Sequence, residues 1–299
     1  MSDNRWLDFR SGVRVATLRP IDSNTKQQLN QHMESVEQAL EADAIAIVSP
    51  IISGLDGLVK QAIESFSTKR QRLAVILDTP GGIAEVVERM VTTIRHYYDE
   101  VYFVIPDRAM SAGTIFSMSG DKIFMSYFSV LGPIDPQIEK DGKLVPALSY
   151  LSQYQRLCQK ADIGQLNTAE YALLNKLDLG ELHQFEQARE LSIDLLEKWL
   201  SQFKFKKWVK HNSTSASVTP DEKRVRAKEI GVALSNNERW HSHGRGIARE
   251  TLTNEIRLQI DKIEDNPQLL PALDEYFALL KDYMSRSQYL MFIHTREYF

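Results

Sequence analysis

The amino-acid sequence predicts an α/β protein with a mostly parallel sheet, followed by a largely helical C-terminal region. In the first half, short apolar runs rich in β-branched or aromatic residues alternate with stretches whose apolar residues recur at helical spacing. From residue 146 to about residue 208, glycines are few and apolar residues recur every three or four positions. Alternating strands and helices are typical of stacked βαβ units with right-handed crossovers.

The elements follow from these patterns in chain order. The N-terminal part is polar and then helical, because Leu29, Met33, Val36 and Leu40 share one helix face. Apolar runs closed by turn formers predict strands over 44–48, 73–77, 101–105 and 122–126, with helices between them over 54–66, 83–98 and 112–118. The helical region should contain about three helices, broken near 162–164 and 178–180, and further helices should span 220–234, start at 246, and run from 271 to the chain end.

Two of the predicted strands end in turns of small residues. Asp78-Thr79-Pro80-Gly81-Gly82 follows the strand over 73–77, and Ala109-Met110-Ser111-Ala112-Gly113-Thr114 follows the strand over 101–105. Neighbouring parallel strands bring such turns together at one edge of the sheet, where open α/β folds place their sites.

These two turns contain the parts that acyl transfer needs. A Gly-Gly turn can offer backbone N–H groups with no side chain in the way, and a serine that opens a helix lies beside unpaired N–H donors. Taken singly, Ser111 would more often be a helix N-cap, and Gly81-Gly82 a simple tight turn. Together and in this order they favour a nucleophile with an oxyanion hole formed by Gly81, Gly82 and Ala112.

At this point the sequence resembles a known family. The Asp-Thr-Pro-Gly-Gly and Met-Ser-Ala-Gly-Thr motifs, together with Val130–Gln137, resemble the serine dehydrogenase proteinase family, within the group of the Clp protease and signal peptide peptidase. The resemblance is specific over about 43–140 and is weaker beyond, where Trp240–Ile247 matches. It implies a Clp-protease/crotonase-like core over 43–145, a helical lead-in over 1–42 and a mainly helical region over 146–299 that completes the site. It also implies a serine endopeptidase that forms homo-oligomers and needs no metal or organic cofactor.

The base for Ser111 is the most open assignment. His241 and His243 lie in a compact glycine-containing turn, and the other histidines fall in expected helices or in a polar loop: His32, His96, His183, His211 and His294. On residue chemistry alone, a histidine in such a turn is more often structural. The resemblance implies a triad in the chain order Ser, Asp, His, with Asp135 orienting His243, and His241 as second choice. The His-Ser-His spacing has no further cluster of ligands to support a metal site.

A Ser-Lys dyad is the competing assignment. It comes from the signal-peptide-peptidase side of the group, because a desolvated lysine can also act as the base. Lys140, Lys143 and Lys160 all follow Ser111, and Lys160 is the best placed. An ordinary solvated lysine remains the commoner role for such residues.

Composition limits the partners and the compartment. The chain of 299 residues has a net charge of −4, which gives no general reason to expect nucleic acid or anionic membrane as a partner. The basic segment 204–210 fits solvated lysines at a helix end better than a nucleic-acid patch. The single cysteine, Cys158, is expected to be buried and suits a reducing compartment. No stretch approaches the ~20 apolar residues of a membrane span. These features favour a cytoplasmic protein.

Two other classes of function stay open. In crotonase relatives the same oxyanion hole stabilises thioester enolates, which would make the chain an acyl-CoA enzyme without need of the serine. Alternatively, the chain could keep the fold as a non-catalytic binding or scaffold protein. The peptide substrate, cleavage preference and ring size do not follow from the sequence.

Overall fold

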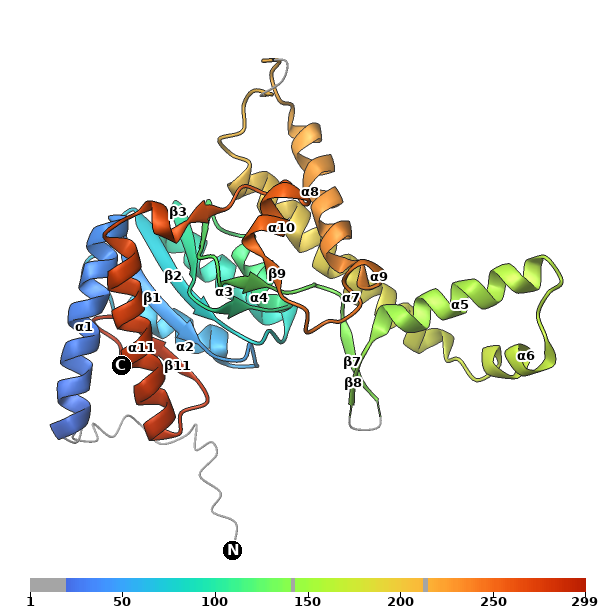
Figure 1. Ribbon diagram of the computed structural model, residues 1–299, viewed down its shortest axis with the longest axis horizontal. Helices are drawn as coiled ribbons and strands as arrows, with labels where there is room; N and C mark the ends of the chain where they lie inside the picture. Colours follow the sequence, from blue (N-terminus) through green and yellow to red (C-terminus); the bar gives the residue numbers. More distant parts are fainter. Residues whose placement is uncertain (1–19, 141–142, 212–214) are drawn as a thin grey trace, which may run out of the picture.

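The computed structural model describes residues 20–140, 143–211 and 215–299. Its centre is a six-stranded sheet covered by helices on both faces (Figure 1). In sheet order the strands are β10 (Asp261–Lys262), β5 (Lys122–Met125), β3 (Glu100–Ile105), β2 (Arg72–Asp78), β1 (Asp43–Val48) and β11 (Phe292–His294). All neighbours pair in parallel except β11, which is antiparallel to β1. The predicted α/β class with a mostly parallel sheet is confirmed.

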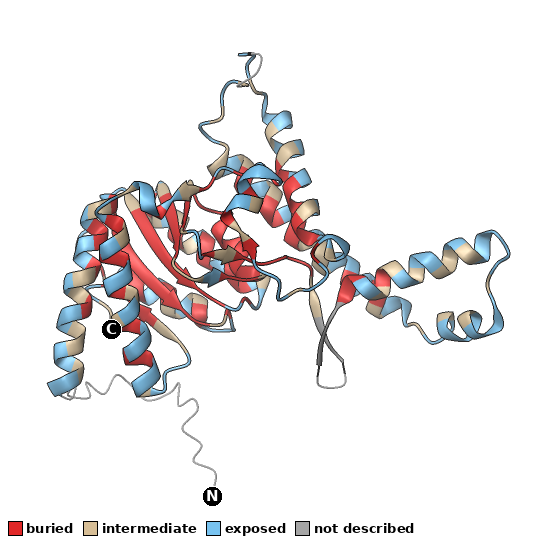
Figure 2. Ribbon diagram, in the orientation of Figure 1, coloured by how far each residue is buried: buried red, intermediate tan, exposed pale blue. Residues whose placement is uncertain are grey.

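Helices bury both faces of the sheet, and successive strand residues point to opposite faces. Ile45 and Ile47 of β1 pack in the cluster that includes α2 (Leu55–Glu64), α3 (Ala84–Tyr97) and α4 (Ala112–Ser117). Ala44 and Ala46 face the other side and pack with α1 (Pro20–Leu40) and α11 (Leu269–Ser287). Figure 2 shows the buried residues concentrated on the sheet and on the inner helix faces. Continuous apolar strands are therefore the expected pattern for this sheet.

A second, smaller sheet and a projecting arm complete the molecule. The small sheet has the order β4 (Arg108–Ala109), β6 (Val130–Leu131) and β9 (Ile247–Ala248). The arm extends from the body (Figure 1) and contains the hairpin β7 (Gln137–Lys140) and β8 (Lys143–Pro146), then α5 (Ala147–Asp162) and α6 (Thr168–Leu174). The chain returns through α7 (Leu179–Trp199), the π-helix η1 (Leu200–Lys204) and α8 (Pro220–Ser235), followed by α9 (Asn237–Trp240), α10 (Arg249–Asn254) and the 3₁₀ helix η2 (Ile263–Asp265).

Local capping explains the predicted starts of two helices, α7 and α8. The Asp178 carboxylate accepts the N–H groups of Gly180 and Glu181 at the start of α7. Thr219 and Glu222 form a capping box at the start of α8, with Pro220 in the first turn. The predicted helix from 271 to the chain end is wrong in its last part. Gln288 has φ 57°, which ends α11, and the following residues add strand β11 to the sheet.

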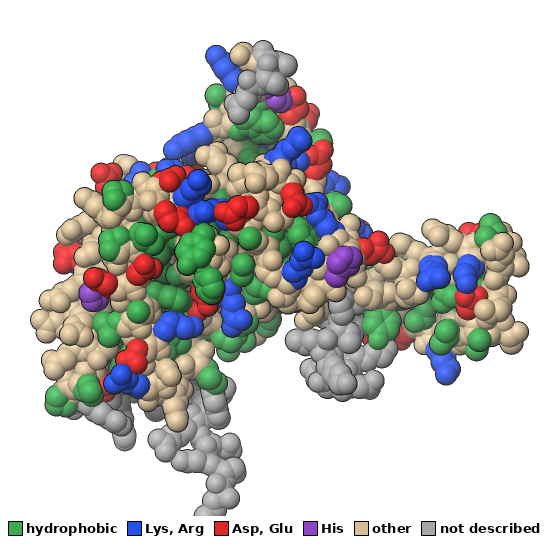
Figure 3. Space-filling view, viewed as in Figure 1, with side chains coloured by type: hydrophobic (Ala, Val, Ile, Leu, Met, Phe, Trp, Pro, Cys, Tyr) green, Lys and Arg blue, Asp and Glu red, His purple; other side chains and the backbone are tan. Residues whose placement is uncertain are grey.

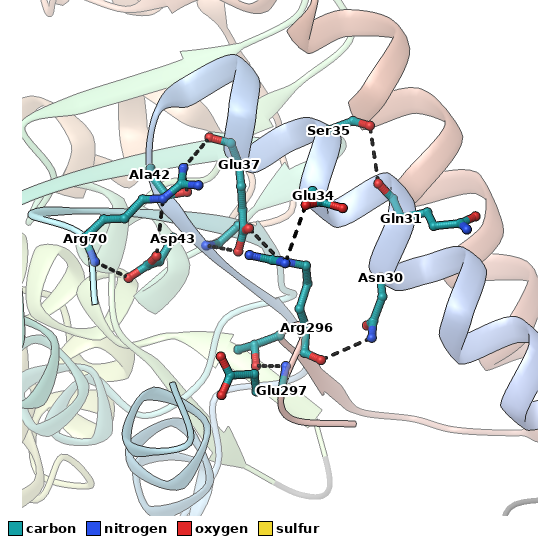
Figure 4. Close-up of polar contacts among 12 residues, drawn as sticks. Asn30, Gln31, Glu34, Ser35, Glu37, Ala42, Asp43, Arg70, Arg296 and Glu297 are labelled. Carbon is teal, nitrogen blue, oxygen red and sulfur yellow. Dashed lines mark hydrogen bonds and ion pairs between the residues drawn. The ribbon is translucent and has the colours of Figure 1, made fainter. Parts of the chain in front are cut away.

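A polar network fastens the C-terminal segment to α1 and the sheet (Figure 4). Glu37 is buried, and its carboxylate accepts the Ala44 N–H at 3.2 Å and Arg296 Nε at 2.7 Å. The Asp43 carboxylate accepts the N–H of Arg70 at 2.9 Å, and the Asn30 side chain donates to the Arg296 carbonyl at 3.1 Å. Burial raises the pKa of Glu37, while Arg296 opposes that shift. Such pairing is what allows a carboxyl group to be buried beside a strand.

His294 does not lie in a helix, as its sequence context suggested, but is fully buried in β11. Its Nδ1 lies 2.8 Å from the Tyr276 hydroxyl, and its Nε2 lies 3.0 Å from the Asn30 side-chain oxygen. Burial, assisted by the charge of Lys26, lowers the pKa of His294 to about 3.

The buried His294 predicts a pH dependence of stability. Its pKa is about 3 in the folded protein, while the unfolded chain takes up that proton near pH ~6.5. The free energy of unfolding should therefore lose about 1.4 kcal/mol per pH unit from this group as pH falls from ~6.5 towards 3. In urea titrations, the stability gap between wild type and His294→Gln should shrink over this range. A difference in unfolding free energy that does not change with pH would contradict this prediction. His183→Gln, at an exposed histidine, is the control.

Two sequence expectations about burial are wrong. Cys158 is half-buried rather than buried. Within the basic segment 204–210, Lys204 is not solvated: its side chain is 4% exposed and lies 3.9 Å from an Asp261 carboxylate oxygen. Burial lowers the pKa of Lys204 to about 8. On the face shown in Figure 3, Lys and Arg are interspersed with Asp and Glu.

Candidate active site

The carboxyl end of β2 and the short strand β4 bring the two predicted turns together. The Thr79 N–H donates to the Arg108 carbonyl, and the Met110 N–H donates to the Thr79 carbonyl, each at 3.0 Å. A Cβ added to Gly81 would lie 2.8 Å from the Cβ of Ser111. The glycine pair and the serine are therefore neighbours, as the sequence predicted.

Ser111 has a strained backbone. Its φ is 50° and its ψ is −115°, and its side chain makes no capping hydrogen bond at the start of α4. A serine that served only as an N-cap would have an extended backbone and would accept an N–H from the first turn. Strain of this kind occurs where the surrounding structure holds a nucleophile on a sharp strand-to-helix turn.

Thr114 and Gly132 stabilise the turn that contains Ser111. Thr114 Oγ1 lies 2.8 Å from the carbonyl oxygens of both Ala109 and Gly132 and accepts the Gly132 N–H at 2.9 Å. A Cβ on Gly132 would come within 3.0 Å of the Ser111 backbone nitrogen. The close approach of β6 thus requires glycine at 132 and fixes the backbone before Ser111.

The backbone N–H and C=O of Gly82 are not used by the neighbouring strand segment at Ile51. The Ile51 N–H donates to the Gly81 carbonyl at 2.8 Å, and the Ile83 N–H donates to the Ile51 carbonyl at 2.9 Å. In a parallel bridge of this kind, the N–H and C=O of the central residue, Gly82, point away from Ile51. Within the described chain, neither the Gly82 N–H nor the Ala112 N–H forms a hydrogen bond, whereas the Gly81 N–H donates to Thr79 Oγ1 at 3.1 Å.

We expect Gly82→Ala to be strongly destabilising. Gly82 has φ 147°, and an added Cβ would lie 2.1 Å from the Ile51 carbonyl oxygen, so the backbone must shift. The loss should be about 3 kcal/mol, against about 1 kcal/mol for Gly164→Ala, which also has positive φ but open space around it. Thermal unfolding of the two variants measures the difference. Equal losses would mean that the close contact with Ile51 is not rigid.

The buried Asp135 and the half-buried His243 form a hydrogen-bonded pair. His243 Nδ1 lies 2.9 Å from Asp135 Oδ1, and their side chains are 15% and 1% exposed. Asp135 follows β6, where the Ile134 N–H donates to the Leu234 carbonyl. His243 lies between α9 and β9, in a loop anchored by the buried Trp240, whose indole N–H donates to the Ala233 carbonyl. An ionised Asp135 makes Nδ1 the donor and leaves Nε2 available to accept a proton.

The serine, the histidine and the glycine turn border one cavity of about 500 Å³. Ser111, His243, Gly81, Gly82 and Ala112 all contribute to its lining. Apolar side chains form much of the remaining wall: Ile83, Ile115, Ile134, Ala188 and Leu191. No hydrogen bond joins Ser111 to His243 among the described residues, as is common in enzymes without substrate.

Helix α7 supplies a wall that sequence reasoning missed. Ala188, Leu191 and Ser192 line the cavity although they lie about 80 positions after Ser111 in the chain. Their helical periodicity indicated only a buried helix face. The strained φ of Ser111 was likewise not predicted, although a Gly-rich strand-to-helix turn around a serine is the signal that could have indicated it.

The second-choice bases lie outside this cavity. His241 is exposed and ends α9, with φ 61° and its N–H bonded to the Asn237 carbonyl. Lys160 lies on α5 in the arm, where it forms an ion pair with Glu170. Lys140 and Lys143 flank the turn of the β7–β8 hairpin, and their side chains lie outside the described part of the structure.

The described residues contain neither a metal-binding cluster nor a membrane-spanning helix. No group of three or more His, Cys, Asp or Glu side chains there is arranged to hold a metal ion. In the same residues, no helix combines the length and the apolar character that crossing a membrane requires.

Comparison with known proteins identifies the family. A family model described as ClpP-like SDH-type serine proteinase matches residues 23–238. The chain belongs to this family. The resemblance inferred from the sequence motifs is therefore confirmed, and the motif-bearing turns, Asp135 and most of the helical region lie within the matched range. His243 lies just beyond it.

Two curated relatives match about half of the chain. Two uncharacterized proteins of Methanocaldococcus jannaschii are 29% identical over 165 residues and 28% identical over 179 residues. The matches cover 54% and 56% of this chain and 52% and 55% of those proteins, so the chain spans about half the length of the curated relatives it matches.

Two solved structures are similar at low identity. Both are mutants of the 1510-N membrane-bound stomatin-specific protease, and one is in complex with a substrate peptide. The identities are 14% and 15%, and the TM-scores are 0.43 and 0.44. Each match covers 77% of this chain, and 82% and 77% of the other chain.

Proposed function

We propose that this member of the SDH-type proteinase family is a serine endopeptidase with Ser111 as its nucleophile. Ser111 Oγ attacks the carbonyl carbon of a peptide bond while His243 Nε2 takes the hydroxyl proton. The proton then passes to the leaving amine as the C–N bond breaks, which leaves an acyl-enzyme on Ser111. Water, deprotonated by His243, attacks this ester, releases the acid and restores the serine.

Asp135 and two backbone amides support this chemistry. Asp135 fixes the imidazole and stabilises the imidazolium that forms at each proton transfer. The N–H groups of Gly82 and Ala112 are free to hold the oxyanion of the tetrahedral intermediate. Gly81 has a different part, since its N–H is engaged by Thr79. It allows the glycine turn to approach Ser111 closely.

The proposal depends on how the reactive groups are placed around one cavity. A strained serine without a capping bond, two amides without a hydrogen bond in the described chain, and the histidine of the His-Asp pair all border the same cavity, with Asp135 behind His243. Their convergence is the arrangement that an acyl-transfer site requires.

The surroundings of the site favour a peptide as substrate. The C=O of Gly82, which accepts no hydrogen bond in the described chain, can pair with the backbone of an extended peptide. The apolar side chains Ile115, Ile134 and Leu191 can accept an apolar side chain next to the scissile bond. We further propose that the chain assembles with copies of itself and acts in the cytoplasm. The family resemblance supports assembly, and the lone Cys158 suits a reducing compartment.

A fluorophosphonate probe tests the proposed class of enzyme. An active serine hydrolase becomes covalently labelled, which intact-mass spectrometry detects. A crotonase-like acyl-CoA enzyme or a non-catalytic scaffold would stay unlabelled while folded. Absence of labelling in a protein with normal thermal unfolding would contradict the peptidase proposal.

A further inference from the structure

The cavity around Ser111 has a single carboxylate in its described wall, that of Glu85. Glu85 lies in the first turn of α3, is exposed and forms no ion pair with a described cation. One turn further along the same helix, Glu88 lies 3.5 Å from Lys198. Among the described residues that line the cavity, only Glu85 and His243 carry a charge or can readily acquire one. A negative charge thus faces the cavity without a cationic partner among the described residues.

Glu85 is within reach of a bound peptide. It is three residues from Gly82, so the two Cα atoms are at most about 11 Å apart. An extended peptide advances about 3.3 Å per residue, so this distance corresponds to about three substrate residues from the scissile bond. A lysine or arginine side chain in that range can bring its cation to the Glu85 carboxylate at the exposed edge of the cavity.

We propose that Glu85 is a specificity-determining residue that selects peptides with Lys or Arg within three residues of the scissile bond. The proposal rests on the peptidase function and names its substrate class more closely. An acidic residue in the first turn of a helix also favours the helix dipole. That structural role would change thermal stability but would leave the choice between peptides unaltered.

Turnover of matched peptides gives the first test. Fluorogenic peptides of one apolar sequence carry Lys, Gln or Glu at a single position, from three residues before the bond to three after it. For at least one position, wild type should have a kcat/KM about fivefold higher with Lys than with Glu. Glu85→Gln should remove this preference and Glu85→Lys should reverse it. The control Glu88→Gln, on the same helix, should retain it.

A binding measurement keeps the test independent of turnover. Fluorescence anisotropy with the Ser111→Ala protein compares the same labelled Lys and Glu peptides, and the Lys peptide should bind more tightly and lose its advantage in high salt. No charge preference in either measurement, or a preference that survives Glu85→Gln, would overturn the role of Glu85. Failure of the peptidase function itself would appear differently, as absent fluorophosphonate labelling of the folded wild type.

Discussion

Replacing Ser111 by alanine should abolish fluorophosphonate labelling and lower kcat/KM for peptide cleavage by about 10,000-fold or more. The reason is that the variant retains the oxyanion amides and the cavity but has no nucleophile, so only the residual effect of binding and electrostatics remains. Ser111 makes no capping bond, so its hydroxyl contributes little to folding and the variant should unfold at nearly the wild-type temperature.

Ser192 provides the matched control for this prediction. It is the other serine that lines the same cavity, but its hydroxyl donates to the Ala188 carbonyl at 3.0 Å within α7. Ser192→Ala should therefore label normally, and intact-mass and peptide mapping should place the adduct on Ser111 alone. An adduct on Ser192, or labelling that persists in Ser111→Ala, would remove Ser111 from the mechanism.

The second large effect is expected at Asp135. Asp135→Asn preserves the size of a side chain that is 1% exposed but replaces the carboxylate that accepts from His243 Nδ1. The amide would favour the wrong imidazole tautomer, so kcat should fall by about 1,000- to 10,000-fold while KM changes little. His243→Ala should cause a loss of similar size. Steady-state kinetics with a fluorogenic peptide, together with thermal unfolding of each variant, measures both effects.

Lys160 decides between the triad and the dyad. Its ammonium is paired with Glu170 on the arm, so Lys160→Ala should leave kcat/KM within about twofold of wild type. If Lys160→Ala were inactive and Asp135→Asn active, a lysine base would replace the His-Asp pair in the mechanism. The same set of kinetic measurements includes His241→Ala, which is expected to be active because His241 lies outside the cavity.

Local signals in the sequence were sufficient for four strands of the large sheet, β1, β2, β3 and β5, and for the two turns that follow β2 and β3. Residues 73–77 and 101–105 are buried on both faces, so their apolar runs were unambiguous. The turns after them contain glycines that the close contacts of Gly81 and Gly82 require. The placement of Ser111 beside these glycines follows from parallel pairing alone.

Features that depend on distant parts of the chain could not be derived in the same way. Strand β11 forms because β1 offers an open edge, and residues 292–294 are too short a run to predict a strand by themselves. Lys204 looked solvated because its burial depends on the position of β10, a two-residue strand. The cavity wall from α7 similarly requires the return of the chain from the arm.

The pairing of Asp135 with His243 followed from the family resemblance and not from residue chemistry. The two residues are 108 positions apart, and nothing local in either segment indicates the other. The family resemblance suggested the pair, and the hydrogen bond of 2.9 Å brings the two side chains together. Residue chemistry alone had favoured a structural histidine at this position.

The central claim is that the Gly82 and Ala112 amides and the Ser111 hydroxyl surround one tetrahedral carbon. A crystal structure of the protein after reaction with a peptide boronic acid tests this most directly. We expect boron bonded to Ser111 Oγ, with one boronate oxygen about 2.7–3.1 Å from both amide nitrogens. Boron bonded to another residue, or an oxygen directed away from both amides, would contradict the account.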